Sequence, residues 1–553
     1  MIFYRSILIL TSMTILIVMM LLFPKTTMSA EGMPYYGKTF SQPDQVQILY
    51  SEPEMDFGTP AFQKEREAFT TQEELIRFIV RLDDSSNHLT VKTIGQSSEG
   101  RAIPALFFFK RGGDNLLKPT IWLQGQIHGN EPAGGEGVLV IAKRLTEELG
   151  EKVLDHVNII IVPRVNPDGS YRFQRGMDND LDGNRDYLKL DLPETKAIRT
   201  LFNKYQPEVV IDAHEYTIGE QLFSTFGEAG YLKYHDLLLL SGKNLNIPKR
   251  IRDLSDDLFI KRTHNKLTES GFSVSNYYVA DVEDEKVIVK EGGTTPRIGR
   301  NALGLTPSIS VLVESRGIGI GREQFKRRVT VQVEAITELI KITAGDARKI
   351  KRLVWSERAK IVNKGLHVND EDWIVIQDER KELDGRRLEV IDVKRGEVIR
   401  IPVQYFSSTD AEPVLIRERP TAYLIDSDQI VVVEKLKQNG VKVYQHPYDV
   451  RLPVESFIVT EKKDGGDYED HRLTHVKTKV TDQNLVFKRG TYVVLTAQPA
   501  SNIAAIALEP ESEDSYVTFN LVPTKLHTRL PIYRFVQNLN PMKPLQSIMD
   551  YRE

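Results

Sequence analysis

The 553-residue sequence contains no cysteine. Without cysteine the chain forms no disulfide, offers no thiolate to a metal and has no cysteine nucleophile, so any bound metal must be held by histidine, aspartate or glutamate. The formal net charge of −4 gives no reason to expect a nucleic-acid partner. Two common hydrolase signatures, H-E-x-x-H and G-x-S-x-G, are also missing. The length predicts at least two domains.

The N-terminus predicts an export signal. Arg5 precedes the apolar run Ile7–Phe23, and Ser29 and Ala30 offer cleavage positions. The apolar run is long for a cleaved signal, so a retained membrane anchor at residues 1–30 is the alternative. We therefore expect an exported protein that is secreted, associated with the cell envelope or anchored in the membrane.

Four apolar runs followed by polar residues predict an α/β fold whose site lies at the ends of the strands, where open α/β sheets place their ligands. The runs are Thr120–Ile127, Val157–Arg164, Glu208–Asp212 and Ser308–Val313. The residues that follow them are His128-Gly129-Asn130-Glu131, Asn166-Pro167-Asp168-Gly169, Ala213-His214-Glu215 and Glu314-Ser315-Arg316-Gly317. Helices are expected at Thr71–Leu82, with Thr71 as the N-cap, and at about Glu323–Thr343.

His128 and Glu131 reach a tight turn before a predicted helix at Ala133–Leu145. Imidazole and carboxylate are ordinary zinc ligands, and a short turn can aim both at one ion. H-x-x-E often arises by chance, however, and a lone glutamate here equally suits the start of a helix. The rest of the sequence must decide between these two interpretations.

Five motifs, in this order, resemble those of zinc carboxypeptidases of the carboxypeptidase A/B family. They are His128-Gly-Asn-Glu131, Asn166-Pro-Asp-Gly169, Asp182-Gly-Asn184-Arg185, Asp212-Ala-His214 and Val313-Glu314, and Ile94–Arg101 resembles the family's first strand. The resemblance covers roughly residues 70–345. It implies an exported bacterial member with a mixed β-sheet flanked by helices and one zinc ion per chain.

The resemblance also assigns the chemistry of the metal. It makes His128, Glu131 and His214 the zinc ligands, a donor set that leaves a fourth position for water. It makes Glu314 the general base and acid, which takes a proton from the zinc-bound water and passes it on.

Substrate contacts are implied in the same way. Asn184 and Arg185 resemble the pair that holds the substrate's terminal carboxylate, because a guanidinium suits two-point contact with a carboxylate. Arg175 resembles the arginine that stabilises the oxyanion, although Arg172 lies close by. Asp182 resembles the carboxylate that orients the first histidine ligand.

The stretch Gly292–Gly304 departs from the family pattern. It lacks the tyrosine normally found shortly before the catalytic glutamate, and Tyr277 and Tyr278 lie further upstream. The stretch contributes Arg297 and Arg300 to the expected specificity pocket, so Arg300 is a predicted substrate-binding residue. An acidic substrate side chain is therefore conceivable.

Two other patterns resemble metal sites. Asp178–Gly183 begins like a calcium-binding loop, but Lys189 stands at the twelfth position, where such loops need glutamate. His471 and His475 are spaced like ligands on a helix, but their neighbours favour loops and strands. We expect both histidines to be solvated.

The C-terminal third predicts β-rich accessory domains. Strands are expected at Trp373–Ile376, Leu388–Val393, Glu397–Pro402, Gln429–Val433, Lys442–Tyr444 and Thr491–Leu495, with an exposed loop at Lys463–Asp467. The predicted parts are a signal peptide or anchor (1–30), an irregular segment (31–70), a zinc carboxypeptidase catalytic domain (71–345), a linker with a β-rich module (346–420) and a β-rich C-terminal module (421–553).

The sequence thus predicts an exported zinc carboxypeptidase that removes C-terminal amino acids from peptides with a free C-terminus. One alternative is a hydrolase of cell-envelope (peptidoglycan) peptides with the same fold. Another is a non-catalytic envelope-binding protein, although the complete ligand set and Glu314 argue against it. The β-rich C-terminal region is the candidate for contact with the cell envelope.

Overall fold

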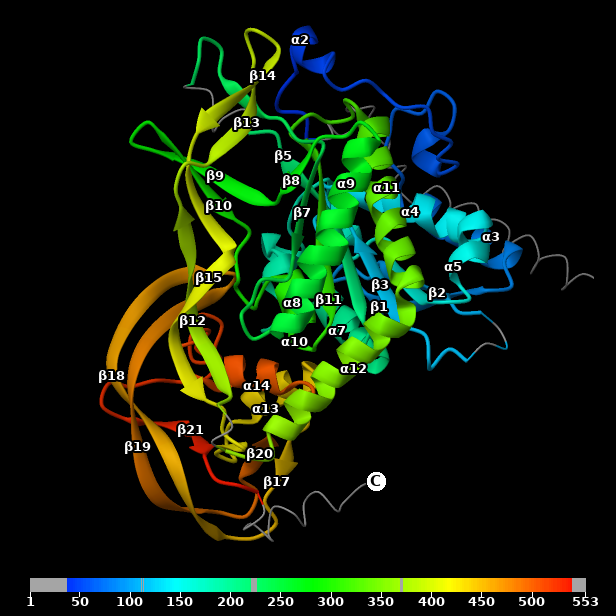
Figure 1. Ribbon diagram of the computed structural model, residues 1–553. Coiled ribbons are helices and arrows are strands. Elements are labelled where there is room, and N and C mark those ends of the chain that lie inside the picture. The colour runs from blue at the N-terminus through cyan, green and yellow to red at the C-terminus, as the bar shows by residue number, and fades with distance from the viewer. Residues whose placement is uncertain (1–36, 111, 113, 220–225, 369–370, 540–553) are drawn as a thin grey trace, which may run out of the picture. The chain divides into compact units, whose positions relative to one another are not determined.

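The computed structural model describes residues 37–110, 112, 114–219, 226–368 and 371–539 (Figure 1). The predicted export signal and its alternative, a membrane anchor, lie outside these residues. None of the helices in the described part of the chain combines the length and the hydropathy of a membrane span.

An eight-stranded mixed sheet lies at the centre of the α/β part (Figure 1). Its strand order is β1-β2-β4-β3-β5-β11-β7-β8, and β4, β3, β5 and β11 are parallel neighbours. The bounds are β1 Leu89–Gln96, β2 Ala102–Phe108, β3 Thr120–Gly125, β4 Asn158–Val162, β5 Val209–Thr217, β7 Leu237–Ser241, β8 Val274–Asn276 and β11 Ile309–Ile318. The predicted mixed sheet is confirmed, and its four parallel strands end at one edge.

Helices α4 and α11 pack against one face of this sheet, and α7 and α10 pack against the other. The α-helices of this part are α2 Asp44–Gln47, α3 Gln72–Ser85, α4 Pro132–Leu145, α5 Glu148–Val153, α6 Pro167–Arg172, α7 Pro193–Tyr205, α8 Lys249–Leu254, α9 Lys261–Glu269, α10 Gly299–Leu305 and α11 Phe325–Gly345. The α3 N-terminus has the predicted Thr71 cap: Glu74 N donates to Thr71 Oγ1 at 3.2 Å, and Thr71 N donates to the Glu74 carboxylate at 2.9 Å.

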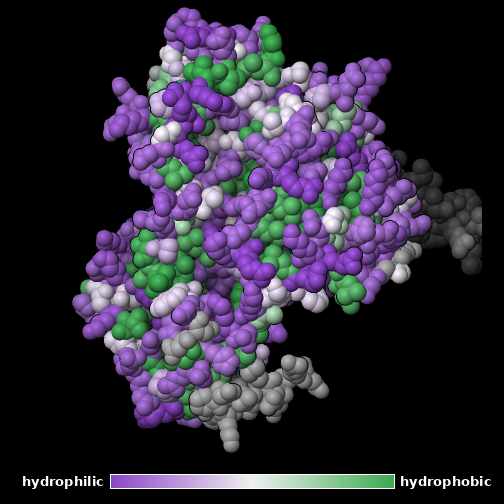
Figure 2. Space-filling model, in the orientation of Figure 1, coloured by the Kyte–Doolittle hydropathy of each residue, from purple (hydrophilic) through white to green (hydrophobic). Residues whose placement is uncertain are grey.

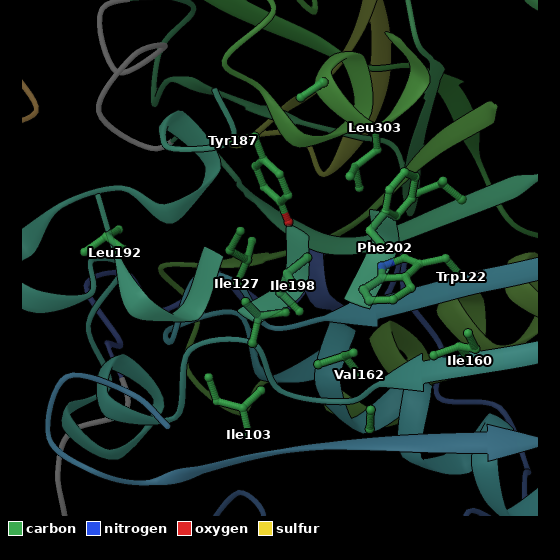
Figure 3. Packing of buried hydrophobic residues seen from close by; sticks show 14 of the residues in the cluster. Ile103, Trp122, Ile127, Ile160, Val162, Tyr187, Leu192, Ile198, Phe202 and Leu303 are labelled. Carbon is green, nitrogen blue, oxygen red and sulfur yellow. The ribbon is translucent and has the colours of Figure 1, made fainter. Parts of the chain in front are cut away.

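The core on the α7 side is shown in Figure 3. Trp122 of β3 packs edge-on against Phe202 of α7, with ring centroids 5.7 Å apart. Burying a large apolar side chain contributes about 1.5–3 kcal/mol, so this layer holds β3 firmly beneath the residues that follow it. On the face in Figure 2, hydrophilic residues predominate and hydrophobic residues form separate smaller areas, as expected when most apolar side chains lie in such cores.

Later strands form three further sheets, two of which include strands from the α/β part. These are β12-β15-β10-β9, β14-β13-β6 and β17-β20-β16-β21-β18-β19. The bounds are β6 Tyr231–Lys233, β9 Tyr278–Glu283, β10 Lys286–Glu291, β12 Trp373–Leu383, β13 Arg387–Asp392, β14 Glu397–Pro402, β15 Gln404–Glu418, β16 Ala422–Ile425, β17 Tyr444–Gln445, β18 Val450–Tyr468, β19 His471–Phe487, β20 Tyr492–Leu495 and β21 Arg529–Phe535. The domain boundary after residue 345 stays a prediction, since two sheets contain strands from both sides of it.

Helices also occur in this region, and one of them replaces a predicted strand. They are α12 Ala347–Lys364, α13 Ile430–Gln438 and α14 Ser501–Leu508. The prediction of a strand at Gln429–Val433 was wrong. Its β-branched residues favour a strand, but Val432, Val433 and Leu436 are buried at helical spacing in α13.

The prediction of a loop at Lys463–Asp467 was also wrong, because these residues belong to β18. Figure 1 shows β18 and β19 as a long curved pair of strands. The pair turns at Glu469 and Asp470, which both have positive φ angles. The prediction of a loop rested on the charged residues of this segment. Much of this end of the β18–β19 pair is exposed, so its strands can carry charged side chains.

Candidate metal centre and substrate cleft

The register of the parallel strands brings the predicted site residues together. His214 of β5 is paired with Glu314 of β11, and Gln124 of β3 is paired with Asp212. His128 lies in the turn between β3 and α4. That turn needs Gly129, because a Cβ there would lie 1.9 Å from the backbone carbonyl carbon of Gly169 in α6.

The three predicted ligands converge on one point. Donor atoms of His128, Glu131 and His214 all lie within 4.8 Å of one another, and the described residues contain no other such cluster of histidine and carboxylate groups. His128 Nδ1 lies 2.6 Å from Glu131 Oε1, His214 Nδ1 lies 3.0 Å from Glu131 Oε2, and the two Nδ1 atoms are 3.3 Å apart. Donors around a tetrahedral zinc ion at about 2.1 Å are roughly 3.4 Å apart. The chemistry and spacing of the set therefore fit zinc.

Each histidine presents its other ring nitrogen to an aspartate. His128 Nε2 lies 3.0 Å from Asp182 Oδ1, and His214 Nε2 lies 3.2 Å from Asp212 Oδ1. Such partners favour the tautomer that leaves Nδ1 free to bind a metal. The place of Asp182 matches its predicted role. Asp212 had no predicted role, although a residue two positions before His214 on a strand shares its face.

A buried hydrogen-bond chain fixes Asp212. Gln124 Nε2 donates to Asp212 Oδ1 at 3.0 Å and to the Tyr187 hydroxyl at 2.7 Å, while its Oε1 accepts from Trp122 Nε1 at 2.8 Å. Trp122 and Tyr187 belong to the core in Figure 3. The packed core thus positions His214 through Asp212.

The site is built to hold a cation. Burial alone would raise the pKa of Glu131, but the nearby His128 and His214 outweigh it and lower that pKa. Burial would lower the pKa of His214, but Asp212 and Glu131 outweigh it and raise that pKa. Glu131 thus stays ionised between the two imidazoles, which favours positive charge at this point.

Glu314 lies beside the cluster in the same cleft and is 7% exposed. Burial raises its pKa to about 7, although His214 acts in the opposite direction. A carboxyl group that titrates near neutrality can both accept and release a proton at working pH. The position and the environment of Glu314 suit its predicted role.

The structure separates the two candidate arginines. Arg175 donates to Asp182 Oδ2 at 2.8 Å and to Glu131 Oε1 at 3.3 Å. Arg172 instead forms an ion pair with Glu99. Of these two arginines, only Arg175 lines the cleft.

Asn184 and Arg185 line the cleft as predicted. The Asn184 side-chain oxygen accepts a hydrogen bond from Gly299 N at 2.8 Å, which ties it to the start of α10. Arg185 Nη1 donates to the Asn184 carbonyl oxygen at 3.0 Å, and no carboxylate of the described chain pairs with Arg185. Its guanidinium is therefore available to an anion.

The cleft has a volume of about 1060 Å³. Tyr277 and Tyr278 line it, and burial followed by the Glu314 charge raises the pKa of Tyr277. Tyr277 thus supplies a phenol to the cleft that Gly292–Gly304 does not. Another cavity, of about 1010 Å³, is lined by residues such as Phe57 and contains no predicted site residue.

The C-terminal region supplies part of the cleft lining, which sequence reasoning did not foresee. We call this part the C-terminal wall; it comprises Asp378, Glu379, Arg380, Phe406, Tyr468 and Glu513. At the β18–β19 turn, Glu469 accepts a hydrogen bond from Asp182 N at 2.8 Å. His471 lies 2.8 Å from Asp191, so the expectation that it is solvated was wrong. Nothing in the sequence spacing points to these contacts.

Comparisons with known proteins agree with this geometry. A model of the family described as zinc carboxypeptidase matches residues 75–190. Carboxypeptidase 2 of Trichophyton rubrum is 33% identical over 477 residues, which cover 84% of this chain and 86% of that protein. Carboxypeptidase 2 of Trichophyton equinum is 33% identical over 478 residues, with the same coverage.

The chain belongs to the zinc carboxypeptidase family. It is a zinc-dependent metallocarboxypeptidase and acts on peptides. A crystal structure of a metallo-carboxypeptidase from Burkholderia cenocepacia is similar at 18% identity, covering 49% of this chain and 69% of that one with a TM-score of 0.38. The family assignment follows from the sequence relatives alone.

Proposed function

We propose that His128, Glu131 and His214 bind the catalytic zinc ion of this carboxypeptidase and that Glu314 moves the protons of the reaction. The proposal is carried by the convergence of the three buried donors beside Glu314 in one cleft. When bound, zinc supplies a Lewis acid that polarises the scissile carbonyl and lowers the pKa of a bound water.

Glu314 accepts a proton from the attacking water and later delivers a proton to the leaving amine nitrogen. Its place within β11, paired with β5 on one side and β7 on the other, fixes its backbone relative to His214. Because burial brings its pKa near neutrality, the carboxyl group can act in both directions in one cycle.

Arg175 stabilises the negative charge that develops on the carbonyl oxygen of the substrate. Its side chain is 43% exposed towards the cleft, while Asp182 and Glu131 hold the guanidinium in place. An N–H donor fixed before the reaction stabilises the charge without reorganising during it.

Asn184 and Arg185 bind the terminal carboxylate of the substrate. A guanidinium makes two parallel hydrogen bonds to a carboxylate, and Arg185 has no carboxylate partner within the described chain. The substrates are therefore peptides with a free C-terminus, and the enzyme removes their last residue.

The test compares kcat/KM for peptides that have a free C-terminal carboxylate with kcat/KM for the same peptides amidated at the C-terminus. We expect kcat/KM to be much lower for the amide than for the free acid. Arg185→Ala should reduce this difference, because it lowers kcat/KM for the free acid by the equivalent of about 2–5 kcal/mol. Arg172→Ala is the matched control, because Arg172 is ion-paired with Glu99 outside the cleft. Equal cleavage of acid and amide, or mainly internal cleavage, would refute carboxylate recognition.

We further propose that residues 1–30 direct export. The support is Arg5 followed by the apolar run Ile7–Phe23. N-terminal sequencing of protein collected outside the cytoplasm should give a mature start near Ala30 or Glu31. A soluble cytoplasmic protein that retains Met1 would contradict export.

A further inference from the structure

The cations that line the cleft differ in whether the protein neutralises them. Arg297 forms an ion pair with Asp514, and its backbone N donates to the same carboxylate at 2.6 Å. Its guanidinium also lies 4.7 Å from the Tyr468 ring. Arg297 is therefore occupied, although the sequence offered it for the specificity pocket together with Arg300.

Arg300 has no such partner. It is 2% exposed, and its Nη2 donates only to the Gly293 carbonyl oxygen at 2.6 Å. Within the described residues its Nε has no hydrogen-bond partner and no carboxylate lies within ion-pairing distance. Burial lowers the pKa of Arg300 to about 10, so the side chain still carries its charge at neutral pH.

A buried charge without a counter-ion is unfavourable, because its lost hydration is not replaced. A protein retains such a group most readily where a ligand supplies the opposite charge. Gly292 lets the backbone pass close to this guanidinium, because a Cβ there would lie 2.8 Å from Arg300 Nη2 and 2.6 Å from the Tyr277 ring. Arg300 nevertheless lines the cleft, where a ligand can supply the missing charge. Arg300 therefore marks an anion-binding position inside the cleft.

Arg300 lies in the substrate cleft, near the residues proposed for catalysis. Arg300 lines the same cleft as Glu314 and Arg185, and its guanidinium lies 5.9 Å from the Tyr277 ring. An anion bound there lies near the proposed general base and near the residue proposed for the terminal carboxylate. The C-terminal residue of a substrate meets these conditions.

We propose that Arg300 binds the side-chain carboxylate of a C-terminal glutamate or aspartate, so that the enzyme prefers substrates with an acidic last residue. This specificity rests on the proposed function, in which Arg185 holds the terminal carboxylate of the same residue. Two arginines then receive the two carboxylates of one acidic residue.

Lys233 is a further cation of the cleft without a carboxylate partner in the described chain, like Arg185 and Arg300. It is almost fully buried, and its Nζ lies 5.3 Å from the Tyr216 and Tyr278 ring centroids. No carboxylate of the described chain pairs with it, and burial lowers its pKa to about 8. Its charge has the same sign as that of Arg300 and so favours an acidic substrate further.

Three carboxylates of the cleft lining, Glu291, Asp378 and Glu513, are engaged with other groups and form no ion pair with Arg300. Glu291 is buried and accepts hydrogen bonds from the backbone N atoms of Ser408 and Thr409 at 2.8 and 2.7 Å. Asp378 accepts from Thr294 Oγ1 at 2.6 Å, and Glu513 lies 3.4 Å from Arg297. Each of the three thus has a partner other than Arg300.

The experiment uses the zinc-loaded enzyme and pairs of peptides that differ only in the last residue, Glu against Gln and Asp against Asn. We expect kcat/KM of the wild type to be at least about tenfold higher for the acidic member of each pair, as one charge-assisted contact implies. In Arg300→Met, kcat/KM for substrates ending in Glu or Asp should fall to the values for Gln or Asn. The values for substrates ending in Gln, Asn or Leu should change little.

Two variants sharpen this result. Lys286→Met removes the same charge from an exposed side chain of β10 that does not line this cleft and should leave the preference intact. Arg300→Lys keeps the charge, so it should retain part of the preference and guards against a variant that fails to fold.

The outcomes separate this proposal from the one on which it rests. A wild type that cleaves Glu and Gln termini equally, or an Arg300→Met variant that slows every substrate alike, would overturn acidic specificity while the carboxypeptidase assignment stands. In the second case Arg300 would serve the terminal carboxylate. Failure to release any C-terminal residue from the whole panel would contradict the proposed function instead.

Discussion

The metal centre and the C-terminal wall of the cleft are built in different ways. His128, His214 and Glu314 lie within or just after neighbouring parallel strands, so the sheet itself sets their spacing. Tyr468 and Glu513 instead come from β18 and from the segment after α14, far along the chain. The difference teaches that the sheet edge provides the reactive groups, whereas the later strands shape the space around them.

The two regions meet at Asp182. Its side chain contacts His128 and Arg175, and its backbone N donates to Glu469 at the β18–β19 turn. The β18–β19 turn, which follows Tyr468 of the C-terminal wall, thus contacts a residue that holds His128. Changes in the two regions should accordingly differ greatly in size.

Removal of the metal should have the largest effect. Dialysis against a chelator should abolish nearly all turnover, because zinc supplies the Lewis acid. Circular dichroism should change little, since the donor residues are held by the sheet and by Asp182 and Asp212. Activity should return when zinc is added back, and full activity in metal-free protein would contradict the account.

Glu314→Gln should have the second largest effect. The amide keeps the size of the side chain but cannot accept the proton, so kcat should fall about 10²–10⁴-fold. Zinc content and thermal midpoint should stay near those of the wild type. A variant with near-normal turnover would mean that another residue is the general base.

Asp212→Asn should lower the affinity for the metal rather than impair proton transfer. Loss of a carboxylate that orients a metal-bound histidine typically lowers metal affinity about 10–100-fold. Competition with a zinc chelator measures this, and Asp178→Asn, at an exposed aspartate of the loop before Asp182, is the control. Equal zinc affinity in the two variants would remove Asp212 from the site.

The pH profile follows from Glu314. Because burial raises its pKa to about 7, the carboxylate that accepts the proton is lost as pH falls. A bound cation favours the charged form and moves the transition to lower pH. The acid limb of kcat/KM should therefore lie at or below about pH 7 and approach a tenfold loss per pH unit. Activity that rises from pH 7 to pH 5 would contradict this sign.

The smallest effect should come from the β18–β19 turn, which follows Tyr468 of the C-terminal wall. Glu469→Ala removes one half-buried hydrogen bond to Asp182 N, worth about 1 kcal/mol, so kcat/KM should fall roughly fivefold. Asp470→Asn, the exposed neighbour in the same turn, should have no effect. A loss in Glu469→Ala as large as that of Glu314→Gln would erase the distinction between the two regions.

The metal centre could be predicted because its signals are local. His128 and Glu131 follow one apolar run, His214 ends another and Glu314 a third, and parallel pairing brings such ends together. Arg175 could not be separated from Arg172 by sequence, because the choice depends on which guanidinium reaches Asp182.

The C-terminal wall could not be predicted, since its contacts join residues hundreds of positions apart. The bond between Glu469 and Asp182 leaves no mark in residue spacing. The ion pair of Asp514 with Arg297 likewise appears only when the chain is folded. Helix α13 was missed because its valines favour strands locally, and tertiary burial overrode that preference.

The most direct test of the metal centre is the zinc content of purified protein, measured by atomic emission spectrometry. The wild type and His367→Ala, at an exposed histidine outside the cleft, should each contain about one zinc per chain. His128→Ala and His214→Ala should each contain almost none. Full zinc occupancy in both ligand variants would contradict the assignment of His128, Glu131 and His214.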